Sequence, residues 1–70
     1  MNNPLDLFAW KVRSERKRQH LTQKQLAERS GVNIRQIQRV ELGESDASNL
    51  TAKNLLALAD ALEVDPKSLI

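Results

Sequence analysis

The 70-residue sequence contains no cysteine, no tyrosine and only one histidine, His20. The missing cysteines exclude a disulfide framework and thiolate metal sites. No second histidine stands near His20 to complete a nucleophile or metal-ligand set. The acidic pairs Glu41 with Glu44 and Asp60 with Glu63 are spaced like ordinary carboxylates at helix ends, with no further oxygen ligands arranged around them. We therefore expect no enzyme activity, no bound metal and no cofactor.

Long apolar runs are missing as well. No stretch approaches the roughly 18 residues that a membrane-spanning helix needs. The first ten residues have neither the basic start nor the long apolar segment of a signal peptide. A cytoplasmic location without membrane contact is therefore expected. A glycine-rich phosphate loop is excluded because the two glycines, Gly31 and Gly43, are twelve positions apart.

Glycine and proline number two each, whereas leucine occurs eleven times and alanine seven times. This mixture favours packed helices over collagen, disorder or turn-rich β structure, so the predicted fold class is all-α. Seventy residues are about half of a typical domain, and residues 1–70 are expected to form a single domain. A domain of this size depends on well-capped helices or on a partner for its stability.

The small net charge of +2 conceals an uneven distribution of charge along the chain. Residues 11–39 carry nine basic residues against two acidic ones, a net of +7. Residues 40–70 carry two basic residues against six acidic ones, a net of −4. This asymmetry is typical of a protein whose basic half meets a polyanion and whose other half faces solvent or a second copy of the chain. A merely solvated basic face is the alternative.

Repeated start and stop signals predict five helices. Four segments contain a hydrophobic staple, in which one apolar residue precedes the N-cap and another follows four positions after the cap. These segments are Leu21-Thr22-Leu26, Val32-Asn33-Ile37, Leu50-Thr51-Leu55 and Val64-Asp65-Leu69. Asn3 with Pro4 starts the first helix and Pro66 the last, while Gly31 and Gly43 fall just past helix ends. The predicted helices span 4–19, 23–30, 34–42, 52–62 and 66–70.

Apolar spacing assigns one core face to each of the first four helices. The members of these faces are Leu5, Phe8, Ala9, Val12, Leu26, Ala27, Ile37, Val40, Leu55, Leu58, Ala59 and Leu62. Leu7 and Trp10 lie off the core face of the first helix. We expect both to pack on the C-terminal helix, because so small a chain needs the buried area. An apolar patch for a partner is the alternative.

Only residues 31–33, which include a glycine, separate the second and third helices. Such a connection makes two helices cross steeply, which is the helix-turn-helix geometry that presents the second helix to the DNA major groove. Helical spacing turns one set of side chains inward, Ile37, Val40 and Glu41, and another set outward, Arg35, Gln38, Arg39 and Leu42.

The outward face of the third predicted helix has the chemistry to read base edges. Arginine donates two hydrogen bonds to guanine, glutamine pairs bidentately with adenine, and Ile34 at the margin of the face can contact a thymine methyl group. The alternative is that Arg35 and Arg39 are solvated surface charges. Like charges one turn apart repel by a few tenths of a kcal/mol, a small cost that something else should compensate.

Residues 21–33 read LTQKQLAERSGVN, followed by Ile37, Glu41 and Gly43 and then by LLALADALEV at 55–64. Over about residues 12–70 this combination resembles the phage repressor and Cro type of helix-turn-helix protein, often called XRE-like. The resemblance implies a five-helix, lambda-repressor-like domain in which the second and third helices form the helix-turn-helix. It also implies a transcriptional regulator that binds a palindromic operator on double-stranded DNA as a homodimer.

The resemblance assigns roles to individual residues. The positions that match base readers are Ile34, Arg35, Gln38 and Arg39. The positions expected to contact phosphate are Gln23, Lys24, Asn33 and Gln36. Arg16 and Glu41 match a structural ion pair that ties the first helix to the third. Leu50, Val64, Leu69 and Ile70 fall near the surface that relatives use for the two-fold contact.

One segment departs from the family pattern. The link from Gly43 to Thr51 is longer than usual and carries Glu44 and Asp46 where relatives often have basic residues, so phosphate contacts from the loop at 44–49 are in question. This loop, the acidic half and the region of Trp10 keep open a second hypothesis, a protein-interaction module such as an antitoxin-like partner. A third hypothesis, sequence-neutral DNA binding, is disfavoured by the modest net charge. The favoured hypothesis is a repressor that occupies a promoter.

Overall fold

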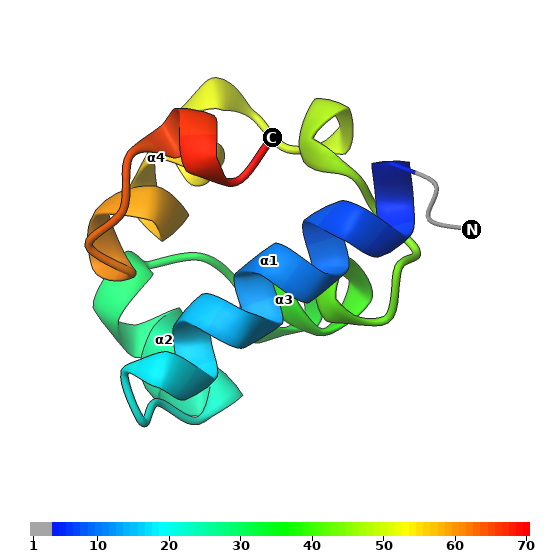
Figure 1. Ribbon diagram of the computed structural model, residues 1–70. Coiled ribbons are helices and arrows are strands. Elements are labelled where there is room, and N and C mark those ends of the chain that lie inside the picture. The colour runs from blue at the N-terminus through cyan, green and yellow to red at the C-terminus, as the bar shows by residue number, and fades with distance from the viewer. Residues whose placement is uncertain (1–3) are drawn as a thin grey trace.

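The computed structural model describes the backbone of residues 4–70 and the side chains of residues 7–70. Its elements are α1 (Pro4–Arg18), α2 (Gln23–Ser30), α3 (Ile34–Glu41), the 3-10 turn η1 (Ala47–Asn49), α4 (Ala52–Ala61) and the 3-10 turn η2 (Pro66–Ser68). Helix α1 crosses α3, α2 packs against both α3 and α4, and η2 packs against α4 (Figure 1). The described residues contain no strand, so the all-α prediction is confirmed for that part of the chain. The expected cap Asn3 and the side chain of Leu5 lie outside the described residues.

The last predicted helix, residues 66–70, is not an α-helix. The chain makes one 3-10 turn there, in which Leu69 N donates to Pro66 O at 3.1 Å. The predicted N-cap of this segment is confirmed, because Asp65 Oδ1 accepts a hydrogen bond from Lys67 N at 2.9 Å. A segment of five residues offers too few i to i+4 hydrogen bonds to repay helix nucleation, and a tighter turn results. The structure therefore has four α-helices among its described residues rather than five.

The four α-helices begin and end within one residue of the predicted positions, and their caps explain why. Thr22 Oγ1 accepts from Gln25 N at 3.0 Å while Gln25 Oε1 accepts from Thr22 N at 2.8 Å, a complete capping box at the start of α2. Thr51 caps α4 in the simpler way, accepting from Asn54 N at 3.1 Å. Gly31 ends α2 in the left-handed region, with φ of 77°.

A single hydrophobic core joins the four helices. The largest fully buried side chains are Val12, Leu26, Ile37, Val40, Leu58, Leu62 and Leu69. Most of the predicted core face is buried, with Ala27 and Leu55 only partly so. No helix in the described range is both long and apolar enough to cross a membrane.

The packing expected for Leu7 and Trp10 is wrong. Trp10 is 58% exposed and Leu7 41% exposed. Helix α1 buries Phe8 and Val12, and successive residues about 100° apart leave Trp10 on the outer side. The C-terminal turn fills the core with Leu69 instead. Trp10 and Leu7 therefore belong to the alternative that the sequence left open, an exposed apolar patch.

Candidate nucleic-acid interface

The turn between α2 and α3 fixes how α3 is presented. Gly31 N donates to Ala27 O at 2.8 Å and reverses the chain, and Val32 is buried beneath the turn. Asn33 then starts α3, its Oδ1 accepting from Arg35 N at 2.8 Å. The two helices pack directly against each other. One face of α3 is thus held in the core, and the other faces solvent.

The exposed stripe of α3 is made of side chains spaced three and four residues apart: Arg35, Gln38, Arg39 and Leu42. The opposite face, with Ile37 and Val40, has no exposed surface. Ile34 is half-buried at the start of the helix, at the margin between the two faces. The four predicted base readers therefore come from one helix, with three of them fully on its open side.

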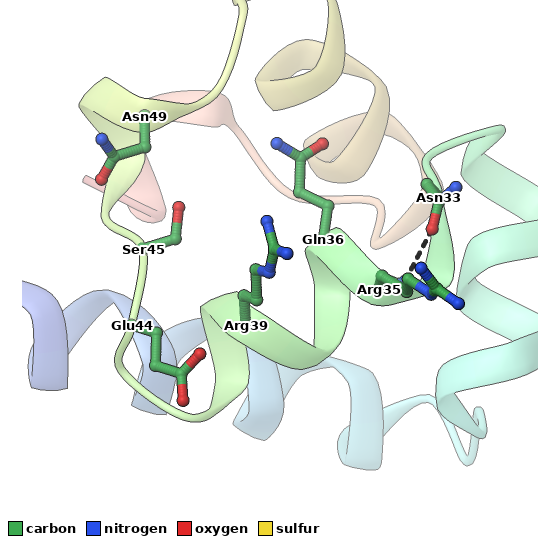
Figure 2. Close-up of a pocket in the computed structure, with 7 residues that line it drawn as sticks. All are labelled: Asn33, Arg35, Gln36, Arg39, Glu44, Ser45 and Asn49. Carbon is green, nitrogen blue, oxygen red and sulfur yellow. Dashed lines mark hydrogen bonds between the residues drawn. The ribbon is translucent and has the colours of Figure 1, made fainter.

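A groove runs between α3 and the loop that follows it (Figure 2). Its lining residues are Asn33, Arg35, Gln36, Arg39, Glu44, Ser45 and Asn49. Within the described part of the chain, Arg35 and Arg39 take part in neither of the two ion pairs, which join Arg16 with Glu41 and Arg18 with Glu15. Both guanidinium groups keep their donors available for a ligand.

Two of the predicted phosphate contacts, Asn33 and Gln36, use their amide oxygens within the protein and leave their NH2 groups as donors. Asn54 Nδ2 donates to Gln36 Oε1 at 2.9 Å, and Asn33 Oδ1 is occupied by the α3 cap. Because the amide oxygens of both side chains are engaged, their NH2 groups are the ends left for a partner. An NH2 group requires an acceptor, and a phosphate oxygen is one. Lys24 is exposed on α2 and lies outside this groove.

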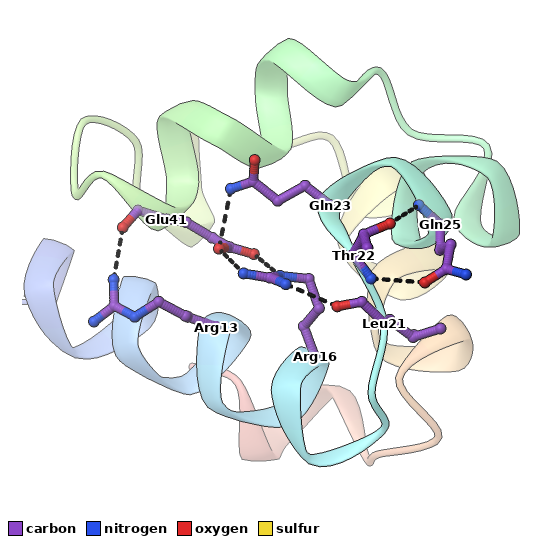
Figure 3. Close-up of polar contacts among 7 residues, drawn as sticks. All are labelled: Arg13, Arg16, Leu21, Thr22, Gln23, Gln25 and Glu41. Carbon is purple, nitrogen blue, oxygen red and sulfur yellow. Dashed lines mark hydrogen bonds and ion pairs between the residues drawn. The ribbon is translucent and has the colours of Figure 1, made fainter.

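The carboxylate of Glu41, at the end of α3, accepts hydrogen bonds from side chains of two other helices (Figure 3). Arg16 on α1 donates from Nε to Oε2 at 2.7 Å and from Nη2 to Oε1 at 2.8 Å, and its Nη1 donates to Leu21 O at 2.8 Å. Gln23, the first residue of α2, donates to Glu41 Oε1 at 3.1 Å. The carboxylate therefore fixes α1, α2 and α3 relative to one another.

This environment favours the charged form of Arg16. The hydrogen bond to Glu41 raises the pKa of the Arg16 guanidinium above its ordinary value, and the attraction of the carboxylate adds to that effect while burial opposes it. The side chains of Arg16 and Glu41 are only 11% and 4% exposed. Gln23 donates one hydrogen of its side-chain NH2 group to Glu41, so its predicted contact with phosphate would use the other hydrogen of that group.

Arg13 is a candidate contact that the sequence reasoning did not single out. Its Nη1 donates to the backbone oxygen of Glu41 at 3.0 Å. A second groove brings it beside Gln23, Gln38 and Leu42, next to the exposed stripe of α3. The sequence did contain a signal for this position. Arg13 lies three residues before Arg16, so the two side chains lie on the same side of α1.

The acidic loop at 44–49 has a structural function. Asp46 Oδ1 accepts from Ser48 N at 3.0 Å while Asn49 Oδ1 accepts from Asp46 N at 3.0 Å, a capping box around η1. Ser45 is buried, and Ala47 packs on the core. Asp46 is thus occupied within the loop. Glu44 alone of the two acids lines the groove beside α3.

The four residues expected near a two-fold contact do not form one surface. Leu50 is 8% exposed and Leu69 is fully buried, so both side chains pack in the core of this single chain, and their expected place near a two-fold contact stays a prediction. Val64 is half-buried beside α4. Ile70 is 63% exposed, and its backbone oxygen accepts from Lys11 Nζ at 3.2 Å, on the side of α1.

Comparison with known proteins agrees with this geometry. Residues 12–69 match the family described as Helix-turn-helix. Among solved structures, the chain is similar to the restriction-modification controller protein C.AhdI from Aeromonas hydrophila, with a TM-score of 0.83 and 33% sequence identity. That similarity covers 94% of this chain and 96% of the other. No curated protein matches the chain in sequence. From the matched residues and the shared fold, the chain belongs to the XRE-like helix-turn-helix family of DNA-binding regulators, the type of the phage repressors and Cro.

Proposed function

We propose that this protein is a sequence-specific transcriptional regulator that binds a palindromic operator as a homodimer, with α3 in the major groove. The observation that carries the proposal is the exposed stripe of α3, where Arg35, Gln38 and Arg39 stand side by side without ion-pair partners in the described chain. Arginine and glutamine are the side chains that pair bidentately with guanine and adenine. Ile34 would add an apolar contact to a thymine methyl group.

Contacts to the DNA backbone would hold α3 in register. The NH2 groups of Asn33 and Gln36 lie beside the stripe, and Arg13 and Gln23 lie on its other side. The free amide groups at the start of α2 add a positive dipole end that favours phosphate. Phosphate contacts of this kind position a protein without selecting sequence. Occupation of a promoter would then repress transcription, which is the simplest mechanism for a domain that only binds.

The experiment compares Arg35→Ala with the matched control Arg29→Ala, an exposed arginine of α2 outside both grooves. Affinity is measured by fluorescence anisotropy on the preferred duplex and on duplexes with each base pair changed. Arg35→Ala is expected to lose about 1–3 kcal/mol of binding free energy per half-site and its preference at one symmetric pair of base pairs. The control should keep both. Unchanged affinity and preference in Arg35→Ala would remove α3 as the reading helix.

A second candidate function, a protein-interaction module such as an antitoxin-like partner, is favoured by one observation. Leu7, Trp10 and Leu42 form an exposed apolar patch with a groove between α1 and the end of α3. On this hypothesis a stoichiometric protein copurifies with the wild type and is lost from Trp10→Ala, while DNA affinity is unchanged. Copurification that survives Trp10→Ala, or none in the wild type, argues against it.

A further inference from the structure

Asn54, in the first turn of α4, reaches across to α3 with its side chain. Its Nδ2 donates to Gln36 Oε1 at 2.9 Å, and both residues are half-buried. Among the described residues this is the only side-chain hydrogen bond that joins α3 to α4. Gln36 belongs to the predicted phosphate contacts, whereas the sequence assigned no function to Asn54. The bond therefore connects the predicted DNA interface to a residue outside it.

The backbone of Asn54 is held in place on both sides. Thr51 Oγ1 caps α4 by accepting from Asn54 N at 3.1 Å. The next residue, Leu55, packs against the core, and Leu58, one turn after Asn54, is fully buried. Asn54 thus offers Gln36 a fixed donor.

This hydrogen bond decides which end of the Gln36 amide faces outward. A glutamine amide has an acceptor oxygen at one end and a donor NH2 group at the other. Because Asn54 holds the oxygen, the NH2 group is turned toward the groove beside α3, on the side of Ser45 and Asn49 (Figure 2). The Gln36 NH2 group donates to no described residue. Since no buried side-chain nitrogen or oxygen in that part of the chain lacks a partner, this group reaches the surface.

An NH2 group suits an anionic ligand in this groove, and a carbonyl oxygen does not. Helix α3 contributes Arg35 and Arg39 to the same groove, and neither joins an ion pair within the described range. Phosphate oxygens of DNA seated on α3 would accept hydrogen bonds from the groove wall but could not donate any. A reversed Gln36 amide would set its own oxygen against them. The direction of the bond from Asn54 therefore decides whether Gln36 supports or opposes DNA binding.

We propose that Asn54 is a positioning residue for DNA binding, whose NH2 group holds the Gln36 oxygen and so aims the Gln36 NH2 group at a phosphate. The inference rests on the proposed function, because it requires DNA to lie against α3. A side chain that is already held in its bound conformation loses less conformational entropy on binding. Asn54 acts only through Gln36, and this dependence distinguishes it from a residue that merely supports the fold.

A double-mutant cycle tests that dependence. Fluorescence anisotropy measures duplex affinity for Asn54→Ala, Gln36→Ala and the double variant, with circular dichroism to verify folding. We expect Asn54→Ala to weaken binding about three- to tenfold per half-site on every duplex alike, and Gln36→Ala to weaken it at least as much. In the Gln36→Ala background, Asn54→Ala should have no further effect. Equal losses in both backgrounds, or wild-type affinity in Asn54→Ala, would overturn the inference.

Asn54→Asp tests the direction of the bond. A carboxylate only accepts, so it would take the Gln36 NH2 group and turn the Gln36 oxygen outward. We expect this variant to bind about tenfold or more weakly per half-site. The added negative charge acts with or without Gln36, so the loss is also measured in the Gln36→Ala background, where it should be at least about threefold smaller. Equal losses in the two backgrounds would leave charge repulsion as the only cause and would contradict the positioning role.

A measurement without DNA separates this inference from the proposed function. NMR relaxation of the Gln36 side-chain NH2 group in the free protein should show restricted motion in the wild type and freer motion in Asn54→Ala. Equal mobility in the two proteins would overturn the inference. If only the positioning role is wrong, Arg35→Ala still loses its base preference while the Asn54 variants bind like the wild type. If the proposed function is wrong, the mobility still changes as expected, but no duplex is preferred.

Discussion

Arg16 on α1 forms a bidentate ion pair with Glu41 at the end of α3. Its Nε and Nη2 donate to the two carboxylate oxygens of Glu41 at 2.7 and 2.8 Å. The same carboxylate accepts from Gln23 at the start of α2. Helix α3 is therefore held to both neighbouring helices at its C-terminal end. Bidentate pairs of this kind add directional specificity as well as energy.

Removal of Arg16 should be strongly destabilising. Arg16→Ala leaves the carboxylate of Glu41 nearly buried without its main partner, and the expected loss is about 3–5 kcal/mol in the free energy of unfolding. Urea denaturation followed by circular dichroism measures it. The matched control is Arg18→Ala, which breaks the pair with Glu15, where Arg18 is 60% exposed; there the expected loss is below about 1 kcal/mol. Similar losses in the two variants would contradict a structural role for the buried pair.

The contribution of Arg16 should not vary with pH in the neutral range. The hydrogen bond to Glu41 raises the folded-state pKa of Arg16 above its ordinary value, so the stability it adds is fully present below the unfolded value and is lost only as the pH rises through the folded value. The difference in unfolding free energy between wild type and Arg16→Ala is thus expected to be constant between about pH 6 and 9. A difference that falls steadily over that interval would show that another titrating group controls the pair.

Gly31 should be needed for its backbone conformation and not for space. Its φ is 77°, and nothing lies within 4 Å of an added Cβ. Gly31→Ala is expected to cost about 1–2 kcal/mol of unfolding free energy, because the left-handed region disfavours a Cβ. Gly31→Asn should cost less, since asparagine tolerates that region. Thermal unfolding ranks the two variants, and a larger loss for the bulkier asparagine would indicate crowding at the turn.

Arg13 should bind DNA phosphate without reading sequence. It lies beside the exposed stripe of α3, and in the described chain its Nη1 donates to Glu41 O while its other donors have no hydrogen-bond acceptor. Arg13→Gln is expected to weaken all duplexes alike and to reduce the slope of log affinity against log salt by about 0.9 for each protomer, about 1.8 for the homodimer. Titrations at several salt concentrations measure that slope, with Arg29→Gln as a control that leaves it unchanged. A change in preference at one base pair would instead make Arg13 a base-reading residue.

Local signals in the sequence were sufficient to predict where the four α-helices begin and end and which face of each helix is buried. Thr22 and Thr51 cap where predicted because a cap depends on residues three positions apart. The face of α3 that is buried also follows from local spacing. The prediction of a fifth α-helix was wrong. Its N-cap is present, but the segment is too short to support an α-helix, and a 3-10 turn forms instead.

Properties set by distant neighbours could not be read from local spacing. Helical spacing places Trp10 off the core face of α1, but it could not show that no other element covers this side chain, which is 58% exposed, or that Leu69 would be fully buried. Likewise, Arg13 becomes a candidate contact only once α1 is seen to lie beside Gln38. The resemblance places Leu50 near the two-fold contact of relatives, and local spacing did not reveal that its side chain is only 8% exposed in this chain.

The proposed reading of DNA by α3 is best tested by selection from a random duplex library at two salt concentrations. We expect enrichment of a palindrome whose half-site centres are one helical turn apart, about 34 Å, with affinity that falls as salt rises. Selection with Arg35→Ala should return the same palindrome without preference at one symmetric pair of positions. Failure to enrich any sequence at either salt concentration, or an enriched site that Arg35→Ala reads identically, would contradict the proposal.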